Sequence, residues 1–348
     1  MRSKEILASL AVAGAVAVFA LFNINNSTTS SSTFLQISEV EQAFNRYIAK
    51  HGRSFGTRQE YQHRLSIFVN NFKKIMEHNM MNAEDEGFTM TLNQFSDMTE
   101  AEFKKFTGRK AKPAGENKKY EHLPIDTLPD SVNWLTAGKV QGPKDQGSCG
   151  SCWAFSAVGA LEGAYAIKTG TLYSLSEQQL VDCSHEGPDG GNQGCDGGWE
   201  DYGISYAVDH WMESESDYPY TAKTGKTCKY DSSKGKVKIS KRTYVTPKDP
   251  AQMKAAVALG PVSVAIQADS YVFQSYGGGI IKSKACGTDL DHAVLVIGYG
   301  SENGVDYWLV KNSWGARWGE KGLFRIIRTT DKSVGICGVL AEPVYAVV

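Results

Sequence analysis

Two cysteines stand three residues apart in the sequence CGSCW at positions 149 to 153. A cysteine thiolate is a nucleophile and a metal ligand, whereas a cysteine in a disulfide is a cross-link. The chain has seven cysteines, at positions 149, 152, 183, 195, 228, 286 and 337. Because an odd number cannot all pair within one chain, one cysteine is left as a reactive thiol or for an intermolecular bridge. The first question is therefore which of the two neighbours is the reagent and which is the tether.

A helix is predicted to begin at Cys152. The run that follows it, WAFSAVGALEGAYAIKTG, carries small and apolar residues at helical spacing and ends in a glycine that suits a helix C-cap. Unpaired N–H groups and the helix dipole stabilise negative charge at a helix N-terminus, which lowers the pKa of a cysteine there. Cys149 lies in the preceding loop. We therefore predict that Cys152 is the nucleophile and that Cys149 is structural.

A cysteine nucleophile needs a proton acceptor and a group that orients the acceptor. His292 starts the strand-like run HAVLVIGYG, and Asn312 follows the strand-like run YWLV. Two other interpretations of C-x-x-C are a zinc site and a redox motif. The zinc site lacks a second pair of ligands at matching spacing, and the redox motif lacks a strand directly before it. Nucleophilic catalysis is the favoured interpretation, with disulfide exchange kept as an alternative.

These features resemble the papain-like cysteine proteases, whose signature is C-G-[SA]-C-[WY] with a histidine and an asparagine far downstream. The resemblance implies that Cys152 is held as a thiolate beside a His292 imidazolium, which Asn312 orients. It also implies that the Gln146 side chain donates to the developing oxyanion. Trp314 would shield the His292–Asn312 hydrogen bond from water. Peptide-bond hydrolysis through a Cys152 thioester is the expected reaction.

The same resemblance implies an α+β fold of two halves with the active site in a cleft between them. A helical left domain would carry the nucleophile, and a β-barrel-like right domain would carry the histidine and asparagine. The strand-like runs VSVAIQ, AVLVIGY, YWLV and LFRII all lie in the second half of the chain. The remaining cysteines would form three disulfides, Cys149–Cys195, Cys183–Cys228 and Cys286–Cys337. No metal or other cofactor is expected.

An inhibitory prodomain is predicted over residues 40–100. Six residues share one face of a predicted helix: Glu60, Arg64, Phe68, Asn71, Ile75 and Asn79. This stripe resembles the ERFNIN signature in the propeptides of cathepsin L-like cysteine proteases. The following TLNQFSDMT resembles the G-x-N-x-F-x-D motif of the same propeptides, with Thr91 in place of the glycine. Residues 101–127 are interpreted as a processing linker, solvated along its Lys-rich stretch 104–119, and residues 128–348 as the mature peptidase.

Further residues are expected to bind substrate because of the same resemblance: Gly150, Gly197, Gly198, Trp199, Glu200, Ala265, Leu290, Asp291, Ala293, Trp314 and Glu342. The main selector in this family is the S2 pocket, which holds the second residue before the cleaved bond (P2). We expect apolar or aromatic P2 side chains, and also Arg or Lys when Glu342 at the pocket floor is ionised. The segment between Cys183 and Cys195 is too short for an occluding loop of the cathepsin B type, which favours an endopeptidase.

The N-terminus predicts entry into the secretory pathway. Arg2 and Lys4 precede an apolar run from Ile6 to Phe22, which suits a signal peptide or signal anchor over residues 1–22. A lysosome, an acidic vacuole or the extracellular space is the expected destination, where disulfides are permitted. The formal net charge of -1 argues against nucleic-acid binding. Expected partners are protein and peptide substrates, the chain's own prodomain and cystatin-type inhibitors, with the chain itself a monomer. The alternative function is a non-catalytic homologue that acts as a binding or inhibitory protein.

Overall fold

The computed structural model describes residues 29–112, 118–185 and 191–348. The chain divides into two compact units, residues 1–69 and residues 70–348. The predicted signal segment, residues 1–22, lies outside the described residues. Within the described part, the apolar stretches of the helices are too short or too polar for any of them to cross a membrane.

The first unit contains α2 (Thr29–His51) and the first half of α3 (Arg58–Met81). Its core is aromatic: Phe44 and Phe68 are fully buried, and their ring centroids are 5.1 Å apart. Tyr47 packs against both rings. The helix predicted from the six-residue stripe is therefore confirmed, with Phe68 of the stripe at the centre of this core.

The second half of α3 explains why the stripe contains asparagines. The Asn71 side chain donates to the backbone oxygens of Ser96 (3.0 Å) and Met98 (2.9 Å). Asn79 both donates to Met90 O and accepts from Met90 N. An amide side chain has a donor and an acceptor, so it can hold an irregular segment whose backbone groups lack partners in a regular element. The stripe thus positions the chain that follows the helix.

The second unit contains most of the helices and 3₁₀ turns. Its helices are α4 (Ala83–Glu86), α5 (Glu100–Phe103), α6 (Cys152–Thr169), α7 (Glu177–Cys183), α8 (Glu200–Asp209), α9 (Pro250–Leu259) and α10 (Tyr271–Gln274). Its 3₁₀ turns are η1 (Lys104–Phe106), η3 (Gly194–Asp196), η4 (Ser232–Lys234) and η5 (Ile336–Gly338). The helix predicted to begin at Cys152 is confirmed as α6, and Gly170 ends it in the left-handed conformation.

The strands of the second unit form one mixed sheet. They are β1 (Phe88–Met90), β2 (Val132–Asn133), β3 (Lys241–Tyr244), β4 (Val262–Ile266), β5 (Tyr276–Ile281), β6 (His292–Glu302), β7 (Val305–Lys311), β8 (Leu323–Ile327) and β9 (Val344–Val347). Neighbouring strands follow the order β1-β5-β8-β7-β6-β4-β9-β3, and β2 pairs with β6. Only β5 and β8 pair in parallel among the strands that the structure describes. The α+β fold is as expected, although the described strands form an open sheet and not a closed barrel.

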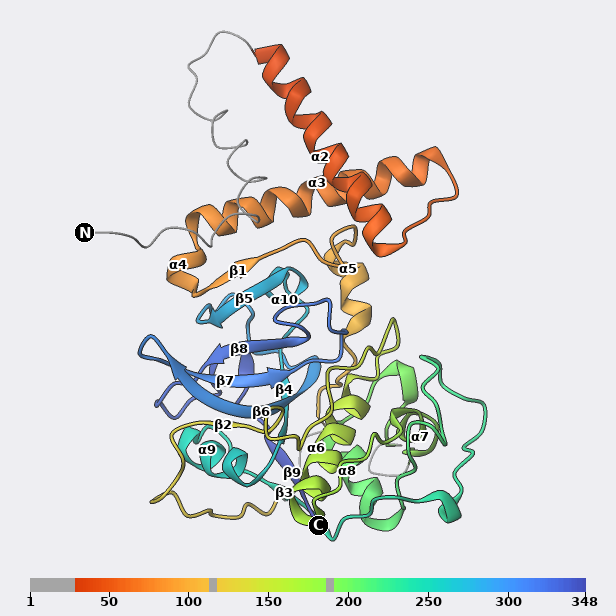
Figure 1. The fold of residues 1–348 in the computed structure, drawn as a ribbon, viewed down its shortest axis with the longest axis vertical. Coiled ribbons are helices and arrows are strands. Elements are labelled where there is room, and N and C mark those ends of the chain that lie inside the picture. The colour runs from red at the N-terminus through yellow and green to blue at the C-terminus, as the bar shows by residue number, and fades with distance from the viewer. Residues whose placement is uncertain (1–28, 113–117, 186–190) are drawn as a thin grey trace, which may run out of the picture. The chain divides into compact units, whose positions relative to one another are not determined.

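Helix α6 packs closely on strand β6, between the sheet and helices α7 and α8 (Figure 1). Its glycines permit this approach: a Cβ atom at Gly159 would lie 2.7 Å from the Leu295 side chain, and one at Gly163 would lie 2.5 Å from the Pro261 ring. Cys152 is the first residue of α6, and His292 is the first residue of β6. Packing these two elements therefore brings the two residues to one place.

Candidate active site

Cys152 is the free cysteine of the described chain, and it is fully buried. The backbone N–H of Ala293 donates to its sulfur over 3.5 Å. The other six cysteines form the disulfides Cys149–Cys195, Cys183–Cys228 and Cys286–Cys337. This is the pairing that the resemblance implied, and it leaves Cys152 as the available thiol.

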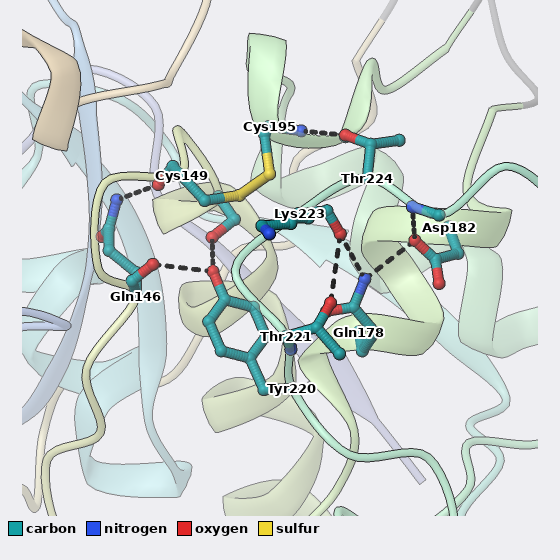
Figure 2. Close-up of a disulfide and its surroundings, with 12 residues drawn as sticks. Gln146, Cys149, Gln178, Asp182, Cys195, Tyr220, Thr221, Lys223 and Thr224 are labelled. Atoms are coloured by element: carbon teal, nitrogen blue, oxygen red, sulfur yellow. Dashed lines mark hydrogen bonds between the residues drawn. A yellow bond between two sulfur atoms is a disulfide. The ribbon is translucent and has the colours of Figure 1, made fainter.

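The loop before Cys152 is held by the Cys149–Cys195 disulfide and by Tyr220 (Figure 2). The single hydroxyl proton of Tyr220 goes to the backbone oxygen of Gln146, 2.9 Å away. The Ser151 hydroxyl, 2.6 Å away, therefore acts as the donor to Tyr220. The Tyr220 hydroxyl thus links Gln146 at one end of the loop to Ser151 at the other end.

The segment that carries Tyr220 is itself tied to helix α7. Gln178 donates to Asp182 and to the backbone oxygen of Lys223, each over 2.8 Å. The Thr224 hydroxyl accepts from the backbone N–H of Cys195, beside the disulfide (Figure 2). Sequence reasoning missed this support, and the signal was only a tyrosine in a loop.

His292, Asn312 and Trp314 form one cluster. His292 Nε2 lies 2.8 Å from Asn312 Oδ1, which also accepts from the backbone N–H of Ser313. Because an amide oxygen only accepts, Nε2 carries the proton, and a neutral imidazole then has an unprotonated Nδ1. Nδ1 is buried without a hydrogen-bond partner among the described residues. The Trp314 ring stacks on the imidazole at 4.5 Å, so the expected shield is in place.

The protonation states differ from the expected thiolate and imidazolium. Burial raises the pKa of the Cys152 thiol to about 12, against the opposing effect of the hydrogen bond from Ala293. Burial also lowers the pKa of His292 to about 4. A charged pair is costly to form where water is excluded, so both groups are neutral in this form of the chain. The helix N-terminus, from which we predicted a lowered thiol pKa, is outweighed by desolvation.

The side-chain donor atom of Gln146, which is predicted to stabilise the oxyanion, is occupied. Its Nε2 donates to the backbone oxygens of Cys149 (2.8 Å) and Phe106 (3.0 Å). The Trp314 indole N–H also donates to Phe106 O, over 3.0 Å. A carbonyl of the predicted linker therefore takes the Gln146 hydrogen bond that the resemblance assigns to a substrate oxygen.

The segment after Phe106 runs through the expected substrate site. The backbone N–H groups of Gly108 and Arg109 donate to Asp291 O over 3.1 and 2.9 Å. Gly198 donates to Gly108 O, and Lys110 donates to Gly198 O. Gly198 and the carbonyl of Asp291, both predicted to bind a substrate backbone, thus bind the chain's own backbone.

Two predicted glycines are needed for this close approach. A Cβ atom at Gly150 would lie 2.6 Å from Cys195 O and 3.3 Å from Gly108 Cα. Gly197 has φ +106, and a Cβ atom there would lie 2.5 Å from Gly108 O. Both distances to oxygen are shorter than real Cβ contacts. Glycine at these positions therefore leaves room for the propeptide backbone at Gly108.

The Arg109 side chain fills a pocket lined with carboxylates. Its Nε lies 3.5 Å from Glu200, and its guanidinium contacts Glu342. A neighbouring cation and carboxylate, Lys112 and Asp201, form a second ion pair beside it. Thr107 and Arg109 are buried, so the prediction of a solvated Lys-rich stretch is wrong for these residues, although Lys104 and Lys105 at its start are exposed. The carboxylates attract the basic residues out of water, an effect that only their proximity reveals.

The other predicted pocket residues lie at the surrounding elements. Trp199, the N-cap of α8, is buried, as are Ala265 and Ala293, which are paired across β4 and β6. Leu290 is partly buried. Among the described residues, these side chains form no hydrogen bond or ion pair with Arg109. The sequence analysis did not predict roles for Arg109, Lys112 and Asp201. The available signal was the basic pair Arg109 and Lys112, together with the two adjacent acids of the run WED.

The chain is similar to known cysteine proteases along most of its length. The papain family cysteine protease model matches residues 128–347, and the cathepsin propeptide inhibitor domain model matches residues 44–103. The probable cysteine protease RD21B of Arabidopsis thaliana is 39% identical over 98% of this chain and 74% of its own. Germination-specific cysteine protease 1 of the same plant is 40% identical over 89% of this chain and 85% of its own.

Solved proenzyme structures are similar over the same extent. Digestive procathepsin L 3 of Tenebrio molitor has a TM-score of 0.79 and 38% identity, over 89% of this chain and 99% of that one. A recombinant stem bromelain precursor has a TM-score of 0.79 and 36% identity, over 89% and 99%. The matched region includes the helical segment that precedes the peptidase.

Proposed function

Because this chain belongs to the papain family of cysteine proteases and carries the family's propeptide, we propose that it is a cathepsin L-like endopeptidase that uses Cys152. The observation that carries the proposal is the joint burial of Cys152 and His292 at the start of α6 and β6, with Nδ1 of His292 free of the Asn312 bond. The nucleophile and its base come from two separate elements that pack together.

The residues perform the reaction in sequence once a substrate replaces the prosegment. His292 Nδ1 takes the Cys152 proton, and the sulfur attacks the scissile carbonyl carbon. Gln146 Nε2 and the backbone N–H of Cys152 stabilise the oxyanion, a contribution typically worth about 3 kcal/mol per donor. The imidazolium protonates the leaving amine, and the neutral imidazole that results later accepts a proton from the water that hydrolyses the thioester. Asn312 keeps the imidazole oriented without adding a charge.

The propeptide makes the chain a zymogen. Residues 106–110 occupy the Gln146 side-chain donor, Gly198 and the Asp291 carbonyl, so no substrate can bind there. The Phe95 and Phe103 rings pack edge-on against Trp314, at 5.7 and 5.1 Å. The inhibitor therefore covers the residue that shields His292 as well as the cleft residues themselves.

The proposed P2 preference includes arginine. The Arg109 side chain, only 2% exposed, already lies between Glu200 and Glu342. Glu342 is 23% exposed and Glu200 is fully buried, so a basic P2 residue would meet one carboxylate at the mouth and one inside. Burial raises the pKa of Glu200, so a neutral Glu200 would also tolerate an apolar P2 side chain. This supports a mixed preference, with Arg or Lys favoured when the carboxylates are ionised.

An endopeptidase is supported by the loop that follows α7. Both ring nitrogens of His185 lie against backbone oxygens of the loop and helix, Nδ1 at 2.7 Å from Asn192 O and Nε2 at 2.9 Å from Asp182 O. A histidine held in this way is not available to bind a substrate carboxylate. The predicted maturation near residue 128, the secretory destination, cystatin binding and the monomeric state remain part of the proposal.

The deciding experiment is hydrolysis of a Phe-Arg reporter by proenzyme activated at about pH 5 with a reductant. Cys152→Ser should abolish turnover, whereas correctly folded Cys149→Ser should retain a weakened activity because it loses only the tether. A processed and folded wild type with no activity would favour the binding-protein alternative. Equal loss in both variants through failed disulfide exchange would favour the redox alternative.

Substrate preference needs a separate comparison. The ratio of Arg-Arg to Phe-Arg reporter hydrolysis should fall in Glu342→Ala and in Glu200→Gln. An unchanged ratio in both variants would show that the two carboxylates do not select the P2 residue.

A further inference from the structure

A second cation site lies beside the arginine pocket, and Lys112 fills it. The Lys112 ammonium contacts the Asp201 carboxylate and lies 3.8 Å from Glu342. It also lies 5.5 Å from the centre of the Tyr244 ring and 6.0 Å from that of Tyr202. The Lys112 side chain is only 9% exposed, and Asp201 is fully buried. The ammonium is therefore enclosed by two carboxylates and two aromatic rings.

The walls of this site belong to the peptidase and not to the propeptide. Asp201 and Tyr202 lie in the first turn of α8, and Tyr244 ends β3. The Tyr244 hydroxyl donates to Asp201 Oδ2 over 2.6 Å, and Arg242 donates to the same oxygen over 3.2 Å. These two bonds hold the carboxylate in place whether or not Lys112 is present.

Removal of the propeptide takes away one of the two cations that contact this carboxylate. Asp201 Oδ1 is buried and has no hydrogen-bond partner among the described residues. Of the two cations on Oδ2, Lys112 leaves with the propeptide and Arg242 stays. A buried carboxylate with an open oxygen, beside aromatic rings, is the arrangement that binds an ammonium group. The described residues contain no cluster of three or more metal-type ligands, which separates this site from a metal site.

The order of the propeptide along the cleft locates the site relative to the substrate. Phe106 lies at Gln146, Arg109 lies in the proposed S2 pocket, and Lys112 lies beyond it. The site is therefore on the side of S2 that faces away from the reacting bond. Three residues of extended chain span roughly 10 Å, so a substrate side chain one or two positions before P2 can reach it.

We propose that the processed enzyme has an ammonium subsite formed by Asp201, Tyr202 and Tyr244, which binds a lysine side chain of the substrate at P3 or P4. This inference rests on the proposed function, because it places the site by reference to S2. It differs from the P2 preference in the substrate position that it selects and in its residues, except that Glu342 contacts Arg109 and also lies 3.8 Å from Lys112.

The first test measures binding and needs no turnover. The full chain is processed at the linker, by its own activity or by an added protease, and titrated with a peptide of residues 104–112. We expect Lys112→Met in the peptide to weaken binding about tenfold, the scale of one hydrogen bond to a charged group. Lys110→Met is the matched control, since Lys110 contacts only Gln193 among the bonds given for its side chain, and it should change binding less than twofold.

The second variant places the effect at Asp201. In Asp201→Asn enzyme the two peptides, with Lys112 or with Met, should bind equally. If Asp201→Asn does not fold, Tyr244→Phe keeps the ring and removes the hydroxyl that donates to Asp201, and it should reduce the difference between the peptides. Equal binding of both peptides to the wild type would overturn the proposal, and so would a difference that persists unchanged in the variants that fold.

A substrate test then separates this inference from the proposed function. Reporters with Lys or Met at P3 and P4 should differ in kcat/KM in the wild type and not in Asp201→Asn. An enzyme that hydrolyses the Phe-Arg reporter but shows no lysine preference contradicts the subsite alone. An enzyme that binds the peptides as expected but hydrolyses nothing contradicts the proposed function alone.

Discussion

The Nε atom of Arg109 lies 3.5 Å from Oε2 of Glu200, and neither side chain is more than 2% exposed. Arg109 belongs to the segment before the peptidase, and Glu200 belongs to the first turn of α8. This buried ion pair links the propeptide segment to α8. Loss of either side chain would leave the other as an unpaired buried charge, which is costly.

Replacing Arg109 should release the inhibitor. Arg109→Met leaves Glu200 buried without its cation, and removal of one partner of a buried pair typically costs about 3 kcal/mol. The lag before activity appears in the activated proenzyme should shorten, and the unprocessed chain should disappear sooner. Lys110→Met serves as the control because that side chain lies nearer the surface. An equal shortening in both variants would argue for a general charge effect.

The Cys152 thiol should be unreactive until the propeptide leaves. With its pKa raised to about 12 by burial, almost no thiolate exists at about pH 8. Iodoacetamide should therefore leave the intact proenzyme unlabelled at Cys152, even where free thiols react readily. Processing should restore labelling, which mass spectrometry of the Cys152 peptide would quantify. Rapid labelling of unprocessed chain would show that the thiol is accessible and ionised in the zymogen.

Tyr220 should matter for turnover more than its burial alone suggests. Tyr220→Phe removes the hydroxyl that joins Gln146 O to Ser151. Each lost hydrogen bond is worth about 1 kcal/mol, so kcat should fall by up to about tenfold with little change in KM.

Tyr218→Phe is the matched control for this variant. The Tyr218 hydroxyl donates to Asp182 over 2.8 Å and is not bound to the Gln146–Ser151 loop in any contact given for the described chain. It should lower the free energy of unfolding by a similar amount and leave kcat unchanged. The same kcat in both variants would reduce Tyr220 to a purely structural residue.

The stability of the chain should depend on pH through a buried pair behind the site. Lys144 contacts Glu177 at 2.8 Å and Glu162 at 3.4 Å. Burial raises the pKa of Glu177 from 4.5 to about 8, against the opposing effect of Lys144 and with the help of Glu162 and Glu215. The folded chain therefore holds a proton that the unfolded chain has lost between these values, and this group's contribution to stability falls as pH rises through that window.

Lys144→Met should steepen this dependence. Lys144 opposes the rise in the Glu177 pKa, so without it the folded chain would hold that proton to higher pH. Urea unfolding of the proenzyme between about pH 5 and pH 8 measures the slope directly. Lys139→Met, at a partly exposed lysine that donates to Ala166 O, controls for the change in net charge. A slope equal to that of the control would mean that Glu162 and Glu177 find other partners.

The sequence by itself determined the local elements and the residue types of the site. Helical spacing predicted α3 and α6, and alternating apolar residues predicted strands β4, β6, β7 and β8, because these patterns depend on neighbours a few residues apart. The order of Cys152, His292 and Asn312 was sufficient to indicate the chemistry, because few reactions use those residue types in that arrangement. It also indicated the family, which the comparisons confirmed.

Only the tertiary structure decided the charge states and the path of the propeptide. A sequence shows that Cys152 begins a helix, but it does not show that water is excluded there, and desolvation reverses the direction of the thiol pKa. It shows a basic stretch, but not that Arg109 and Lys112 meet buried carboxylates of α8. Both outcomes arise from contacts between segments far apart in the chain, where burial sets the strength of every charge.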